Sequence, residues 1–99
     1  MSSSQKSLKP GDEVLIRCEA KNGQFDDEMA VTINTLDGII SGFVQKSVIE
    51  EHADGVALIR GRVISLDHNS VTVLVKGEFF TSNGLARILD RDVNPSMAA

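Results

Sequence analysis

The sequence contains no tryptophan and no tyrosine, so its four phenylalanines are the only large aromatic residues among 99. Tryptophan and tyrosine most often supply the hot spots of protein interfaces, the grooves that hold proline-rich peptides and the platforms on which bases stack. A surface that binds through aromatic contacts must therefore use Phe25, Phe43, Phe79 or Phe80.

Cysteine is also scarce, because Cys18 is the only one. A single cysteine excludes an internal disulfide. The first ten residues, MSSSQKSLKP, lack the apolar core of a secretory signal. No apolar run approaches the roughly 20 residues that span a bilayer. These absences predict a cytoplasmic protein that does not associate with membranes.

The charge balance is acidic, with a net charge of −4 and 14 acidic residues spread along the chain. Unspecific binding to a phosphate backbone normally requires a basic surface. The composition therefore disfavours a nucleic-acid partner, although a local basic stripe remains compatible with it.

The residues that are present alternate in the manner of half-buried strands. Between Asp12 and Ala20, Val14 and Ile16 share one face while Arg17 lies on the other. Similar stretches follow at residues 29–35, 39–45, 55–66, 71–76 and 78–82, separated by turn signals at Asp37-Gly38, Asp67 to Ser70 and Asn83-Gly84. Residues 46–53 are expected to form a short helical turn, and residues 85–93 a short helix or an irregular closing segment.

Two short motifs occur twice. The triplet Leu-Ile-Arg appears at residues 15–17 and 58–60, and Val-Thr-Ile at residues 31–33 resembles Val-Thr-Val at residues 71–73. The spacing predicts two repeats, 11–53 and 54–93, each too small to fold alone, that close one shared core. Chance similarity between strands of an all-β chain is the alternative.

We therefore expect an all-β fold, a small barrel of five to seven mostly antiparallel strands, with a possible pseudo-twofold internal repeat. Gly42 lies inside the third strand and predicts a bulge or sharp bend. The expected organisation is an N-terminal tail at residues 1–8, one domain at residues 9–93 and a C-terminal tail at residues 94–99.

A resemblance to known modules covers about residues 9–50. The segment DGIISGFVQKSVI (residues 37–49) looks like the end of a bacterial SH3-like module and equally like the middle of an S1-type OB domain, and KPGDEV (residues 9–14) resembles the opening strand of either. The S1-type resemblance implies binding of single-stranded RNA, with Phe43 at the matching position. The chain beyond Lys76 departs from a simple five-stranded barrel, and the missing tyrosine and tryptophan leave an SH3-like module without its groove for proline-rich peptides.

No motif indicates catalysis. Cys18 with His52 or His68 could form a thiol–imidazole pair, but Cys18 shares the face of Val14 and is better explained as a buried apolar residue. The acidic stretches at residues 26–28 and 50–54 lack the spacing of a calcium loop, and two histidines with one cysteine do not form a zinc site. We expect a protein that is not an enzyme, with no cofactor and no metal.

The remaining candidates lie on the surface. Arg17, Arg60 and Arg62 are expected to point outward and to form a basic stripe, or to pair with Glu19 across strands. Phe79 and Phe80 are consecutive in a strand, so only one can enter the core. The other is exposed for a dimer or partner contact, unless residues 85–93 cover it.

These residues predict a non-catalytic β-barrel adaptor that binds a protein partner or a second copy of itself. The alternative is an OB-like domain that binds single-stranded nucleic acid through Phe43 and the arginines.

Overall fold

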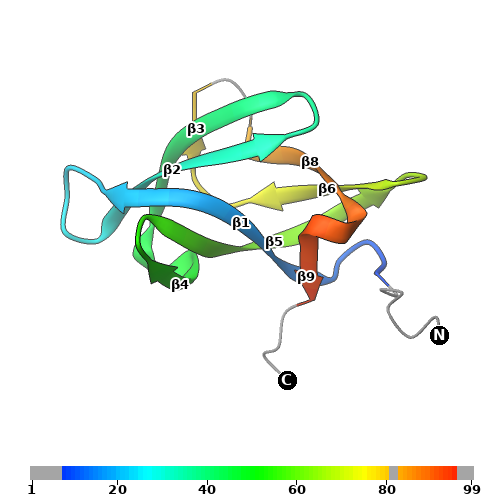
Figure 1. Ribbon diagram of the computed structural model, residues 1–99, viewed down its shortest axis with the longest axis horizontal. Coiled ribbons are helices and arrows are strands. Elements are labelled where there is room, and N and C mark those ends of the chain that lie inside the picture. The colour runs from blue at the N-terminus through cyan, green and yellow to red at the C-terminus, as the bar shows by residue number, and fades with distance from the viewer. Residues whose placement is uncertain (1–7, 81–82, 96–99) are drawn as a thin grey trace.

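The computed structural model describes residues 8–80 and 83–95, without the side chains of residues 51–53 and 95. Strands dominate it (Figure 1). They are β1 (Glu13–Asn22), β2 (Glu28–Thr35), β3 (Gly38–Gln45), β4 (Ile49–Ala53), β5 (Val56–Leu66), β6 (Ser70–Val75), β7 (Glu78–Phe79), β8 (Leu85–Leu89) and β9 (Val93–Pro95). Two short 3-10 turns, η2 (Lys46–Val48) and η3 (Asp90–Asp92), precede β4 and β9.

All nine strands belong to one antiparallel sheet, which confirms the predicted all-β fold class. The strand order is β7-β3-β2-β1-β5-β6-β8, with β4 added to β5 and β9 added to β1. The sheet is strongly curled into a half-barrel, and β1 and β5 cross the middle of it (Figure 1).

The alternation in the sequence explains the core. Residues at every second position of β1, β2, β5 and β6 point to the concave side, because successive side chains in a strand face opposite ways. The fully buried side chains of this core include Ile16, Ile33, Ile59, Val14, Val31, Val63, Val71, Val73, Val75 and Val93. Burial of these aliphatic groups is the main force that holds the curled sheet together.

Curling brings the two ends of the sheet together. β6 ends at Val75 and β7 begins at Glu78, although β7 pairs with β3 at the far end of the strand order. Two linking residues span only about 10 Å, so β3 must lie close to β6. Gly77 lies in this link, and a Cβ atom there would come within 2.7 Å of Val44 Cγ1 and 2.8 Å of the Phe43 carbonyl oxygen.

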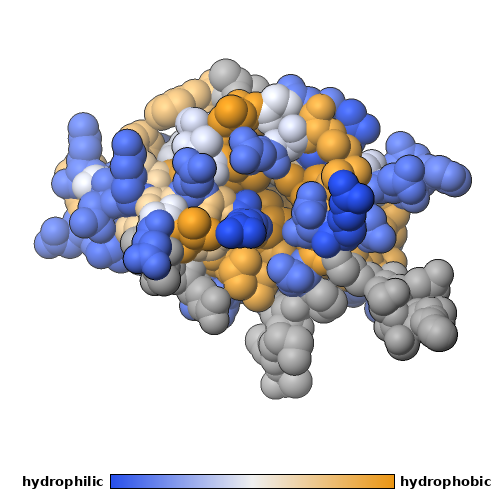
Figure 2. Space-filling model, viewed as in Figure 1, coloured by the Kyte–Doolittle hydropathy of each residue, from blue (hydrophilic) through white to orange (hydrophobic). Residues whose placement is uncertain are grey.

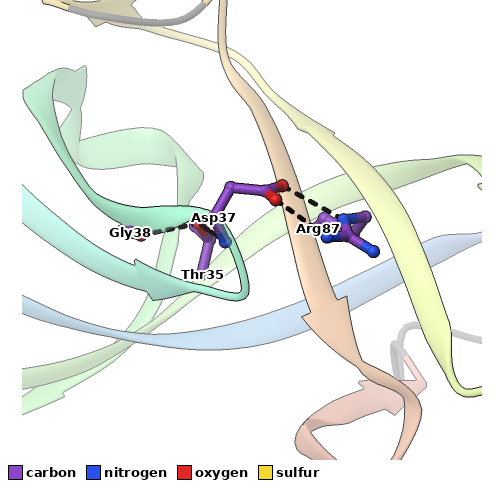
Figure 3. A network of polar contacts seen from close by, with 4 residues as sticks. All are labelled: Thr35, Asp37, Gly38 and Arg87. Atoms are coloured by element: carbon purple, nitrogen blue, oxygen red, sulfur yellow. Dashed lines mark hydrogen bonds and ion pairs between the residues drawn. The ribbon is translucent and has the colours of Figure 1, made fainter.

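An ion pair also links β8 to the turn between β2 and β3 (Figure 3). Arg87 of β8 donates hydrogen bonds of 3.1 Å and 2.8 Å to the carboxylate of Asp37, which lies in the turn between β2 and β3. The backbone N–H of Leu36 also donates to the Arg87 carbonyl at 2.8 Å. Thr35 orders the turn, since its hydroxyl donates to the Gly38 carbonyl and accepts from the Asp37 N–H. The hydrogen bonds from Arg87 and its positive charge lower the pKa of Asp37.

The strand pairing has pseudo-twofold symmetry. Ile16 of β1 and Ile59 of β5 occupy matching positions in the Leu-Ile-Arg triplets, and they lie opposite each other. β9 pairs with β1 at Ile16↔Val93, and β4 pairs with β5 at Ile49↔Ile59. The strand order on either side of β1 and β5 is also equivalent, with β2 and β3 on one side and β6 and β8 on the other. Each half thus contributes its last strand to the first strand of the other half.

The symmetry is imperfect in three places. A bulge between Val63 and Ser65 shifts the register of β6 on β5. The register of β4 on β5 also shifts, between Ile49 and Glu51, whereas β9 pairs with β1 without a shift. Within residues 8–80 and 83–95, β7 also has no counterpart in the first half. The Leu-Ile-Arg triplets occupy equivalent positions, but the Val-Thr triplets do not, because Val31 lies opposite Ala20 whereas Val73, and not Val71, lies opposite the equivalent Val63. The repeats at residues 11–53 and 54–93 stay a prediction.

Two expected elements differ from the structure. Residues 46–53 form the 3-10 turn η2 followed by strand β4, and not a helical turn throughout. Residues 85–93 contain strand β8 and the turn η3, and Val93 begins β9. β9 continues to Pro95 and pairs with β1 at Val14 and Leu15, within the range expected to be a C-terminal tail. In both cases a neighbouring strand supplies backbone partners that the local sequence does not reveal.

Gly42 does not mark a bulge. The register between β2 and β3 runs without interruption past Val31↔Gly42. The glycine is needed for a different reason, because a Cβ atom at this position would overlap the Glu78 carbonyl and come within 2.7 Å of Phe79 Cα. β7 therefore packs directly on the backbone of β3.

Candidate binding surfaces

The three arginines lie on the outer face of the two central strands. Their neighbours Ile16, Ile59 and Val63 are buried in the core. Because successive side chains of a strand face opposite sides, the arginine side chains point outward. In the view of Figure 2, hydrophilic side chains project from the middle and from both ends of the molecule, with hydrophobic surface between them. Arg17 and Arg62 are exposed, and Arg60 is half-buried.

Arg60 is held by partners other than the expected Glu19. Its Nε lies 2.7 Å from a carboxylate oxygen of Glu50 in β4, and its guanidinium donates a hydrogen bond to the Ser47 carbonyl of η2. The β4 register shifts between Ile49 and Glu51, so Glu50 is the bulged residue at this point. A bulge redirects a side chain, and here the redirected carboxylate lies against Arg60.

Arg17 lines a cleft of about 680 Å³ between β2 and the η3–β9 segment. Within residues 8–80 and 83–95, its guanidinium has neither an ion pair nor a hydrogen bond. The rim carries Arg91 and Asn94 from the η3–β9 segment, with Thr32 and Asn34 from β2. Such a rim offers hydrogen-bond donors around an exposed cation.

Phe43 and Phe80 form an edge-to-face pair on the outer side of β3, with ring centroids 5.7 Å apart. The Phe80 N–H donates to the Ser41 carbonyl at 3.0 Å, which places Phe80 beside Ser41 and between Phe43 and Ile39. Phe80 is 71% exposed and Ile39 is 66% exposed. We refer to Ile39, Phe43 and Phe80 as the aromatic strip.

Phe79 has the opposite orientation to its neighbour. It packs against the core, whereas Phe80 points into solvent. This is the arrangement expected for consecutive residues of a strand. The residues that follow Leu85 pair with β6 and β1, and the exposure of Phe80 shows that they leave its ring uncovered.

Arg17 and the aromatic strip do not form one patch. Phe43 is in register with Ala30 of β2, and Ala30 with Lys21 of β1. Arg17 lies further along β1, roughly 13 Å from Lys21 at about 3.3 Å per residue, and two strands away from Phe43. Arg60 and Arg62 lie on β5 and line a pocket together with Val48, Lys76 and Gly77, which also line a pocket that contains Phe43. Arg17 and Phe43 therefore belong to separate surfaces.

The residues considered for catalysis are dispersed. Cys18 is buried in the core, and burial raises the pKa of its thiol to about 11. His68 is exposed in the loop between β5 and β6; the side chain of His52 lies outside the described residues. Among the side chains that the structure describes, no group of three or more His, Cys, Asp or Glu could hold a metal ion.

The raised pKa of Cys18 predicts a loss of stability in alkali. The thiol of the unfolded chain ionises near its ordinary pKa of 9.0, whereas the folded thiol keeps its proton up to about 11. The free energy of unfolding should therefore be unaffected below pH 9 and should fall between pH 9 and 11, by about 2 kcal/mol at most. Urea unfolding at pH 7, 9 and 10.5 measures this fall, and Cys18→Ala should lack the part that the thiol contributes. Equal alkaline slopes for both proteins would contradict the prediction.

Sequence reasoning missed two residues that define these surfaces. Ile39 lies in a predicted strand, and its alternation with the buried Ile40 is the signal that indicates an outward side chain. In the sequence, Glu50 appears only as part of an acidic cluster. Its role depends on the bulge in β4, for which the sequence carries no signal.

None of the helical segments in the described part of the chain is long and apolar enough to cross a bilayer. Comparisons with models of protein families, with curated proteins and with solved structures gave no match.

Proposed function

We propose that this protein is a non-catalytic β-barrel module, SH3-like or OB-like in architecture, that binds protein through the aromatic strip, with a second copy of the chain as the first partner to test. The observation that carries the proposal is the exposed ring of Phe80, paired edge-to-face with Phe43 on the face of β3 that also carries the exposed Ile39. Large apolar groups gathered on one face of a small protein are typical of interaction sites.

Three features favour protein over nucleic acid as the partner. The aromatic strip lies apart from Arg17, whereas proteins that bind single strands place stacking rings along a basic groove. Arg60 is already engaged by Glu50. The net charge of −4 also opposes association with a phosphate backbone.

The test is a sedimentation-velocity series of the full chain from micromolar to millimolar concentration. Wild-type protein should associate as concentration rises, and Phe80→Ser should remain monomeric, because removal of an anchor aromatic residue costs an interface about 2 kcal/mol or more. Phe25→Ser is the matched control, since Phe25 is another exposed phenylalanine, in the loop between β1 and β2. Association that survives in Phe80→Ser would contradict a role for the strip.

A second measurement addresses the nucleic-acid alternative. The amide spectrum of the labelled protein is recorded with a short single-stranded RNA at low and high salt. Protein binding through the strip predicts no salt-sensitive shifts at Arg17, Phe43, Arg60 or Arg62. Such shifts would favour the alternative function, since contacts with the phosphate backbone weaken steeply as salt rises.

A further inference from the structure

The pseudo-twofold symmetry relates two clefts on opposite sides of the central strands. The first contains Arg17 and lies where β2 and β9 separate along β1. The second, of about 440 Å³, contains Arg60 and lies where β6 and β4 separate along β5. Because Ile16 and Ile59 face each other across the axis, Arg17 and Arg60 are equivalent residues.

The linings of the two clefts correspond beyond the arginines. Cys18 and Glu19 follow Arg17 in the first cleft, as Gly61 and Arg62 follow Arg60 in the second. Each cleft is also lined by residues of the equivalent 3-10 turns, Asp92 of η3 in the first and Val48 of η2 in the second. The two clefts thus share an equivalent central strand, an equivalent neighbouring strand and an equivalent 3-10 turn, whereas Ile88 of β8 and Asn94 of β9 line only the first.

The second half shows what such an arginine binds. Glu50 follows Ile49, the residue of β4 that pairs with Ile59, and its carboxylate forms the 2.7 Å ion pair with Arg60. Arg60 also donates to the Ser47 carbonyl. The chain itself therefore supplies a carboxylate to the arginine of this half.

In the first half the corresponding carboxylate is missing. Asn94 follows Val93, the residue of β9 that pairs with Ile16, as Glu50 follows Ile49, but Asn94 pairs regularly with Leu15 whereas Glu50 is bulged. Arg17 consequently lies exposed in its cleft, without an ionic partner among the residues that the structure describes. Asn94, Asn34 and Thr32 provide neutral hydrogen-bonding groups around it.

We propose that the Arg17 cleft binds a carboxylate side chain of an acidic peptide segment, in the position that Glu50 occupies beside Arg60 in the other half. A guanidinium forms paired hydrogen bonds with a carboxylate, and Arg91 on the rim adds a second positive charge. Glu19 and Asp92 also line the cleft and offset these charges. They favour a singly charged carboxylate over the higher charge of a phosphate group.

The test uses a short peptide with blocked ends and two glutamates as its only charges, with the glutamine version as its comparison. The peptide is titrated into labelled full-length protein while the Nε–H signal of Arg17 and the amides of Thr32 and Asn34 are followed. The glutamate peptide should shift these signals. Arg17→Gln should weaken binding about tenfold or more, because a hydrogen bond to a charged group is lost. Arg62→Gln is the matched control on the same face and should bind normally.

Two further variants use the symmetry directly. Asn94→Glu should place a carboxylate in the cleft that Asn94 and Arg17 both line, and should abolish peptide binding while the protein remains folded. Glu50→Asn should expose Arg60 and create a second set of shifts there; loss of an exposed ion pair has little effect on folding.

The proposal is overturned if the glutamine peptide binds as well as the glutamate peptide, if neither peptide shifts the Arg17 signals, or if Arg17→Gln and Asn94→Glu bind like wild type. Phe80→Ser separates this site from the aromatic strip. That variant should keep the glutamate-dependent shifts even though it loses association through the strip.

Discussion

Replacing Ile59 with alanine should lower the free energy of unfolding by about 2–5 kcal/mol, the range for truncation of a buried isoleucine. Ile59 is completely buried and lies opposite Ile16 on one side and Ile49 on the other. Three strands from both halves therefore meet at this residue. The cavity would form where the halves join, with little freedom for the surrounding strands to close it.

Chemical denaturation monitored by circular dichroism measures this loss. Ile64→Ala is the control, because Ile64 lies on the same strand with its side chain partly exposed. The control should lose less than about 1 kcal/mol. Similar losses for the two variants would show that Ile59 is not a central packing residue of the shared core.

Replacing Gly42 with alanine should have the second largest effect, a destabilisation of about 1–3 kcal/mol from overpacking. The added methyl group would overlap the Glu78 carbonyl and lie 2.7 Å from Phe79 Cα and 2.8 Å from Phe79 Cδ1. Backbone atoms cannot rotate out of the way as a flexible side chain can. β7 must therefore move away from β3, and the packing of Phe79 on the core is weakened with it.

The displacement should also reach the surface, because Phe80 follows Phe79 directly. Thermal unfolding gives the stability of Gly42→Ala, and nuclear Overhauser contacts between the rings of Phe43 and Phe80 report the position of the strip. Ser41→Ala, on the outward side of the same strand, should change stability by less than about 0.5 kcal/mol. A Gly42→Ala protein with unchanged stability and ring contacts would contradict close packing of β7 on β3.

Much of the fold follows from the sequence because its long strands alternate regularly. The pattern from Val14 to Ala20 matches the burial along β1, and the turn at Asp37-Gly38 joins β2 to β3 as expected. The short closing strands β4 and β9 were not predictable in this way. Each has few residues after a 3-10 turn, and each exists because a central strand of the other half offers it backbone hydrogen bonds.

The surfaces were predictable to a smaller extent. The opposite orientations of Phe79 and Phe80 follow from their adjacency in a strand. The separation of Phe43 from Arg17 depends on which strands are neighbours, and this is a property of the whole sheet. The pairing of Arg60 with Glu50 depends on a bulge. Contacts between residues far apart in the chain produce no periodic pattern in a single sequence, so they could not be predicted from it.

The exchange of β4 and β9 between the halves has a consequence for how the molecule assembles. Two separate chains, each equivalent to one half, would have to meet in solution and trade their final strands, as in a domain-swapped twofold dimer. Their folding would then depend on protein concentration. Here the tight connection through Asp54 and Gly55, both with positive φ, covalently joins β4 to β5. The two halves therefore exchange β4 and β9 within one chain. The stability of this pairing does not depend on protein concentration.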